Sequence, residues 1–195
     1  MDTNLENIKN SYDKYISLLK KFFPDDESQA GIDRLEVELG ERLALCPREL
    51  TPDKGGTPGG LIAFALNTAK HAKAFDAKVD PKSLARVALV HELGRLGDPG
   101  EGMDLFIPEE SDWHREKLGR YYKYNDKCPK MSVAHRTLFY ISRYKLDVTK
   151  DEWVALATSA GFQYDENRFY ANETLPLAQA LHTARTFALS DLKDQ

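Results

Sequence analysis

His91 and Glu92 stand side by side at the end of an apolar run, LARVALV, and Arg95 follows three positions later. Imidazole nitrogens and carboxylate oxygens are both donors that bind divalent metals in proteins. One His-Glu pair supplies at most two donors, so a metal site here needs ligands from other parts of the chain. Because the preceding residues are apolar, a charged side chain at this place must be paired or must face a cleft.

Further ligands would come from the few other histidines and cysteines of the chain. The two cysteines are too few for a disulfide framework or a cysteine-rich zinc site, and we expect both thiols to be reduced. A single histidine on a helix is more often a surface or satisfied core residue than a metal ligand. The residues in question are His71, His114, His135, His182, Cys46 and Cys128.

Apolar stripes with a spacing of three or four residues indicate the helices that would position these side chains. Asp80 and Pro81 give one helix an N-cap and a proline at its first position, and Thr149 with Glu152 gives another a capping box. No segment alternates convincingly with a period of two, so we predict an all-α fold. The predicted helices cover residues 4–23, 32–45, 61–75, 81–96, 111–123, 132–145, 149–160 and 175–192.

Breaks in the stripes indicate the loops and the organisation of the chain. Residues 24–31 read as a solvated loop, and residues 46–60, with three prolines and four glycines, form the strongest break. A loop of about 14 residues is long enough to be functional. Residues 165–176 could form a short extension or hairpin. We predict one compact domain, with residues 1–50 as N-terminal helices packed on a helical core of residues 51–195.

Composition excludes several classes of protein. The 195 residues are 42% hydrophobic and 30% charged, which is ordinary for a soluble globular protein. A net charge of −4, with basic and acidic residues interspersed, gives no strong signature of duplex nucleic-acid binding. No apolar run reaches the roughly 18 residues of a membrane span, and the N-terminus has no signal-peptide pattern. We therefore expect a cytoplasmic protein without membrane association.

Six segments resemble, in their order, those of the HD-domain superfamily, and especially a branch common in phage genomes. HD domains are all-helical, and in active members histidines and aspartates from separate helices bind one or two divalent metals. The metals activate a water that attacks a phosphoester. The resemblance implies an HD-like helical bundle of phage origin that works in the host cytoplasm. The segments, within residues 59 to about 190, are GGLIAFALNTAK, LVHELGRLGD, SDWHREKLGRYYKYN, MSVAHRTLFYIS, AGFQYDENRFY and LPLAQALHTARTFAL.

The chain departs from this family at the metal ligands themselves. Active relatives carry a histidine where this chain has Phe64, a histidine-containing stretch where it has Ser159, and an acid where it has Arg185. Glu92 also stands where the family has aspartate, and its carboxylate lies one methylene further from the backbone. The matching positions that keep a donor are His91, Glu92, His135 and His182, of which His182 is not reliably a ligand in relatives.

Arg185 is the most informative departure, because its guanidinium would put a permanent positive charge where a dication should lie. We predict that Arg185 pairs with Glu92, and that Phe64 fills the volume of a lost ligand. On this interpretation the site holds no metal or other cofactor. The alternative is a residual site for Mn, Mg or Fe at His91, Glu92 and His135. The resemblance also predicts that His91 and His135 approach each other across one cavity.

Basic residues near this position remain candidates for binding. Arg95 lies where relatives carry lysine, and Arg115, His182 and Arg185 complete the candidate set, although Arg115 equally fits a solvated helix face. The leading hypothesis is a catalytically degenerate HD-like protein that binds another protein or, second, a nucleotide or phosphorylated small molecule. The alternative is a metal-dependent phosphohydrolase that acts on a nucleotide or other phosphate ester. A third hypothesis is a structural component of a larger assembly.

Overall fold

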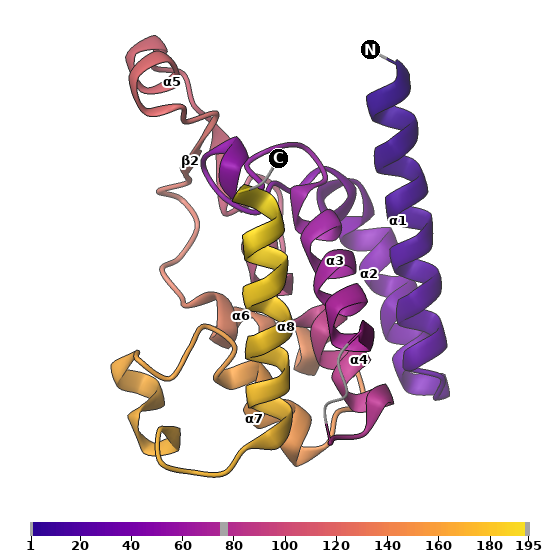
Figure 1. Ribbon diagram of the computed structural model, residues 1–195. Coiled ribbons are helices and arrows are strands. Elements are labelled where there is room, and N and C mark those ends of the chain that lie inside the picture. Colours follow the sequence, from indigo (N-terminus) through magenta and orange to yellow (C-terminus); the bar gives the residue numbers. More distant parts are fainter. Residues whose placement is uncertain (1, 75–77, 194–195) are drawn as a thin grey trace.

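A computed structural model describes residues 2–74 and 78–193, and over these ranges the chain is all-α apart from one small sheet (Figure 1). The predicted all-α fold class is therefore confirmed. Short 3-10 turns, η1 (Pro52–Lys54), η2 (Leu93–Leu96) and η3 (Asp165–Tyr170), lie between the helices. The α-helices are α1 (Asp2–Phe22), α2 (Asp26–Leu45), α3 (Gly60–Ala74), α4 (Pro81–Val90), α5 (Asp112–Leu118), α6 (Val133–Arg143), α7 (Lys150–Ala157) and α8 (Pro176–Lys193).

One hydrophobic core joins the two N-terminal helices to the rest of the molecule. Leu19 of α1 and Leu35 of α2 are fully buried in the same cluster as Val87 of α4 and Leu181 of α8. Helix α3 packs against both α4 and α8, so these three helices form the centre of the bundle. Cys46 and Cys128 are both buried free thiols. No helix of the described residues combines the length and the apolar character needed to cross a bilayer.

The region around α5 differs from the sequence prediction. A single helix over 111–123 is wrong: α5 ends at Leu118, where Gly119 takes the left-handed conformation with φ of 60°. The strands β1 (Phe106–Pro108) and β2 (Tyr122–Tyr124) pair antiparallel on either side of it. No residue of α5 is buried, and Figure 1 shows this helix projecting from the body of the molecule.

Three other boundaries also differ from the prediction. Residues 24–31 are largely helical, because the Asp25 carboxylate accepts a hydrogen bond from the Ser28 amide at 2.8 Å and caps α2 six residues early. The helix predicted over 81–96 ends at Val90 and continues as η2. Residues 165–176 contain η3 in place of an extension or hairpin. The capping box of Thr149 and Glu152 is confirmed at the start of α7.

Close contact between α2 and the turn after α6 depends on Gly31. A Cβ at this position would overlap the carbonyl oxygen of Tyr144. On the same side of α2, the Ser28 hydroxyl donates to the Lys145 carbonyl at 3.3 Å and accepts from the Asp147 amide at 2.8 Å. The helix therefore contacts this turn backbone to backbone, with no room for a side chain.

Gly31→Ala is expected to destabilise the protein, although alanine favours helices by about 1 kcal/mol over glycine. Overpacking against a backbone carbonyl costs about 1–3 kcal/mol or more, so the net change should be a loss in the free energy of unfolding. Gly40→Ala, on the same helix, is the matched control because its Cβ would meet only the Tyr12 hydroxyl. Urea denaturation should give Gly31→Ala a lower free energy of unfolding than Gly40→Ala. An equal or higher value for Gly31→Ala would refute this close contact.

Candidate functional site

The buried carboxylate of Glu92 is paired with three guanidinium groups from three parts of the chain. Arg95 lies one 3-10 turn further on and forms a close ion pair with it. Arg48, from the loop between α2 and α3, approaches both carboxylate oxygens at 3.5 Å. Arg185 of α8 places its Nε 3.2 Å from Oε1. The pairing of Arg185 with Glu92 that the sequence predicts is present in the structure.

Backbone geometry brings the nearest of these partners into place. Helix α4 ends at Val90, and the following residues turn into η2, which returns Arg95 towards Glu92 at a spacing of three residues. Gly94 permits this turn to lie against α6, where its amide donates to the Thr137 hydroxyl at 2.9 Å. A Cβ on Gly94 would overlap the carbonyl oxygen of Val133.

The loop between α2 and α3 supplies Arg48 and a second carboxylate. The Arg48 amide donates to the Gly55 carbonyl at 2.8 Å, and its guanidinium donates to the Lys54 carbonyl at 3.1 Å. Glu49 accepts from Arg95 at 2.9 Å, and Arg95 also donates to the Arg48 carbonyl at 2.6 Å. The glycine- and proline-rich loop thus holds one side of the cluster in place.

Aromatic packing covers the opposite side of Arg48. Its guanidinium lies 4.0 Å from the centre of the Phe64 ring, a geometry that attracts a cation to the aromatic face. The same ring lies 5.9 Å from the imidazole of His91. Phe64 therefore fills the position between the loop and the end of α4 with a buried ring.

His91 is buried with one ring nitrogen satisfied. Its Nδ1 lies 2.9 Å from the Ala88 carbonyl oxygen, which requires a proton on Nδ1. No described residue forms a hydrogen bond with Nε2, which lies 3.8 Å from the nearer Glu92 oxygen. Burial, assisted by the charges of Arg185 and Arg48, lowers the pKa of His91 to about 4, although the adjacent Glu92 carboxylate acts to raise it. His91 is therefore neutral at pH 7.

The electrostatics of Glu92 are set by its arginine partners. Burial alone would raise the pKa of the carboxyl, but the charges of Arg95 and Arg48 outweigh that effect and hold it well below its usual range. Burial also lowers the pKa of Arg48 to about 10, which still leaves the group charged at neutral pH. Three guanidinium groups and the carboxylates of Glu92 and Glu49 together leave a net charge of +1.

The remaining predicted site residues lie apart from this cluster. His135 is on the exposed face of α6 and does not line the cavity beside His91, so the predicted approach of the two imidazoles is not observed. Arg115 is exposed on the projecting α5. His182 is half-buried one turn before Arg185 on α8, and its Nδ1 has no hydrogen-bond partner among the described residues.

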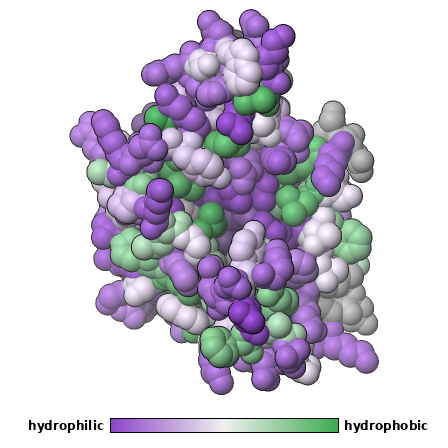
Figure 2. Space-filling model, turned by 90° about the vertical axis from the view of Figure 1, so that its left-hand side faces the viewer, coloured by the Kyte–Doolittle hydropathy of each residue, from purple (hydrophilic) through white to green (hydrophobic). Residues whose placement is uncertain are grey.

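A cavity of about 310 Å³ opens beside the cluster. Its polar lining includes the charged groups of Arg185 and Glu166 and the hydroxyl groups of serine and tyrosine side chains. Figure 2 shows a hydrophilic hollow in the middle of the face from which α5 projects. The lining residues are His91, Glu92, Arg95, Ser132, Val133, Ala134, Ser159, Ala160, Tyr164, Glu166 and Arg185.

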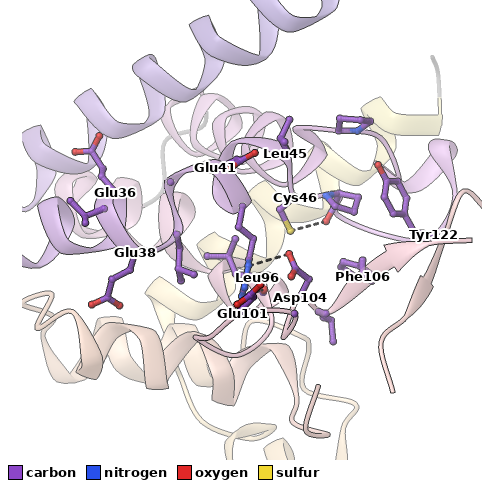
Figure 3. A pocket seen from close by; sticks show the side chains of 18 residues that line it. Glu36, Glu38, Glu41, Leu45, Cys46, Leu96, Glu101, Asp104, Phe106 and Tyr122 are labelled. Carbon is purple, nitrogen blue, oxygen red and sulfur yellow. Dashed lines mark hydrogen bonds and ion pairs between the residues drawn. The ribbon is translucent and has the colours of Figure 1, made fainter. Parts of the chain in front are cut away.

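A larger cleft of about 650 Å³ lies elsewhere, and its charged side chains are five carboxylates and Arg42 (Figure 3). Arg42 crosses it, pairing with Asp104 at 3.1 Å and donating to the Asp98 carbonyl at 2.7 Å, so this arginine fixes the loop after η2. The carboxylates labelled in the figure are Glu36, Glu38, Glu41, Glu101 and Asp104. Within residues 5–74 and 78–193, no three histidine, cysteine, aspartate or glutamate side chains lie together as metal ligands.

The residues around Glu92 do not fit a divalent metal. The carboxylate that would bind the ion is already paired with three guanidinium groups, and the Phe64 ring beside Arg48 and His91 offers no donor. The one feature that resembles a ligand is His91, whose Nδ1–H is bound to a carbonyl while Nε2 keeps a lone pair. A single such nitrogen does not make a metal site.

Comparisons with protein-family models, with curated proteins and with solved structures return no match for this chain. Its function is therefore inferred from the residues and geometry described above. Sequence reasoning missed Arg48 and Glu49, the two charged residues that the loop contributes. The available signal was their position in a glycine- and proline-rich loop that is long enough to be functional.

Replacing Glu92 is expected to cost more stability than replacing Arg185. Glu92→Gln leaves three guanidinium groups without their shared counter-charge, and breaking a buried pair in this way costs about 3–5 kcal/mol. Arg185→Ala should cost less, about 2 kcal/mol, because Arg48 and Arg95 still neutralise Glu92. The sequence alone predicts a larger loss of stability for Arg185→Ala, because it identifies no other cation that pairs with Glu92. Urea denaturation of both variants tests this order, and equal losses would contradict it.

The stability of the protein should fall between pH 7 and pH 5 because of His91. The unfolded ring, with a pKa near 6.5, binds a proton in this range, whereas the folded ring has a pKa of about 4 and does not. The folded state is therefore disfavoured as pH falls, by about 2 kcal/mol over these two pH units. His91→Asn keeps a donor for the Ala88 carbonyl and removes the titration. The free energy of unfolding of this variant should change less between pH 7 and pH 5 than that of the parent. If both change equally with pH, His91 binds a proton in the folded protein as readily as in the unfolded chain.

Proposed function

We propose that this chain is a catalytically degenerate HD-like protein, phage-encoded, that acts in the host cytoplasm as a binding or regulatory module for another protein. The observation that carries the proposal is the Glu92 carboxylate, paired with Arg48, Arg95 and Arg185. The resemblance of six ordered segments to a phage-type branch of HD domains supports the origin.

Charge competition is the physical argument against catalysis at this position. A divalent metal would have to replace guanidinium groups that pair with a fully buried carboxylate, and those groups would then lie beside a second positive charge. Arginine cannot lose its charge to relieve this repulsion. Without the metal, the family's route to an activated water has no source of hydroxide.

Exposed apolar side chains support a protein as the partner. The segment from α5 through β2 carries large side chains whose exposed fractions are 59% for Trp113, 42% for Leu118, 56% for Tyr121 and 53% for Tyr124. Aromatic residues are enriched in the centres of protein interfaces, where they bury much area at low entropic cost. A projecting segment of this composition is suited to contact with another protein.

Two observations favour alternative functions. The lone pair on His91 Nε2 favours the phosphohydrolase, which would use His91, Glu92 and His135 with Mn, Mg or Fe on a nucleotide or other phosphate ester, although His135 lies on the exposed face of α6 outside the cavity. The cavity beside Arg185 favours binding of a nucleotide or phosphorylated small molecule, although Glu166 in its lining opposes an anion. Arg95 adds little to such a site, because Glu92 and Glu49 already pair with it.

Metal binding by the purified protein separates these functions. We expect metal analysis to find far less than one manganese, magnesium or iron per chain, and calorimetry with manganese to show no tight binding. A variant that restores donors, Phe64→His with Ser159→His and Arg185→Asp, is the positive control and should bind manganese more tightly than the parent.

Tight binding of manganese by the parent, together with hydrolysis of a phosphodiester, would overturn the proposal in favour of the phosphohydrolase. Loss of that metal on His91→Asn would place it at this site. Binding of a nucleotide by metal-free protein, weakened by Arg185→Gln, would instead support the small-ligand function.

A further inference from the structure

A groove of about 850 Å³ lies between α1, α3 and α4, away from the Glu92 cluster. Its floor is apolar: Leu18 and Phe22 of α1 and Leu66 of α3 are half-buried there, above the buried Leu84 and Leu89 of α4. In Figure 1 the C-terminal half of α1 runs beside α3 and α4. Helix α1 forms one wall of the groove, and α3 and α4 form the other. The α1 wall extends from Lys14 to Phe22, about 12 Å at the rise of an α-helix.

Lysines surround this apolar floor on every wall. All five lining lysines are exposed at their chain positions, and none forms an ion pair with another described residue. No acidic residue is among the described residues that line the groove. Asp191, an acid near Lys70, already accepts hydrogen bonds from His71 and Asn67. The lysines are Lys14 and Lys21 on α1, Lys70 and Lys73 on α3, and Lys82 on α4.

We infer that this groove binds an acidic amphipathic helix of a protein partner. An apolar floor with walls about two helical turns long suits the leucine-like anchors that a helix presents at positions i, i+3, i+4 and i+7. Lysines on both walls would then face acidic residues on the two flanks of that stripe, which steers association and fixes the register. The inference rests on the proposed function in taking the partner to be a protein.

The distribution of charge favours a helix over an anionic lipid. A single acyl chain carries its charge at one end, so it needs basic groups at one end of a pocket. Here the lysines lie on three helices, at both walls and along the length of the groove. Charge spread in this way matches a ligand with acidic groups along two sides, as an acidic amphipathic helix has.

The test uses the full chain and a labelled peptide of about 14 residues, with leucines at i, i+3, i+4 and i+7 and glutamates on both flanks. Fluorescence anisotropy should show binding that weakens with added salt. Lys14→Glu with Lys70→Glu and Lys82→Glu should weaken it at least about tenfold. The matched control reverses three exposed lysines outside both the groove and the segment from α5 through β2, Lys127→Glu, Lys130→Glu and Lys150→Glu, and should change it less than about twofold.

Leu66→Ser tests the apolar floor, and a peptide of the same composition with its leucine stripe scrambled tests the register. The Leu66→Ser variant should bind the striped peptide more weakly than the parent protein does. The parent protein should also bind the scrambled peptide more weakly than the striped one. The inference is overturned if the striped peptide fails to bind up to about 1 mM, if both lysine triples weaken binding equally, or if only vesicles of anionic lipid bind. Metal binding by the parent would defeat the proposed function and leave these peptide results unchanged, so the two failures are distinguishable.

Discussion

An ionised carboxylate buried in an apolar core is the constraint on which the centre of this molecule depends. Removing such a charge from water costs several kcal/mol, and the cost must be offset by partners within the protein. Glu92 lies two residues beyond Val90, the end of the apolar helix α4, and is almost fully buried, so it requires cations. It obtains Arg95 from its own turn, Arg48 from the loop between α2 and α3, and Arg185 from α8. One carboxylate thereby joins three distant parts of the chain.

The same constraint has two chemical solutions, a metal ion or a set of guanidinium groups, and they exclude each other. A metal leaves coordination positions for water or substrate and makes a carboxylate part of a reactive centre. Guanidinium groups satisfy the carboxylate with hydrogen bonds and leave it unreactive. Arg48 extends this arrangement to a neighbouring position, because its guanidinium also lies over the ring of Phe64.

Local signals in the sequence predict most of the fold but only part of the site. Helix caps and apolar stripes depend on neighbouring residues, so Asp80 and Thr149 mark true helix starts. The resemblance to HD domains located Glu92 and Arg185 together, although they are 93 residues apart. No local pattern relates Arg48 to Glu92, since their contact depends on how a loop closes over the bundle. His135 was misplaced because neighbouring helix positions point in directions about 100° apart, and the buried face of α6 holds Ala134 and Arg136 instead.

Helix α4 connects this ion-pair cluster to the surface. Its C-terminal end leads into Glu92 and the ion-pair cluster, while Leu84 and Leu89 on its body lie beneath the lysine-rimmed groove. A cluster that fixes the end of α4 therefore also fixes the floor of that groove, without contact with any ligand. An ion-pair cluster can in this way support a surface groove that lies away from it. The buried charge also maintains itself: an apolar replacement for Glu92 would leave Arg48 and the partly buried Arg185 without a counter-charge and Arg95 with Glu49 alone, and breaking buried pairs in this way is costly.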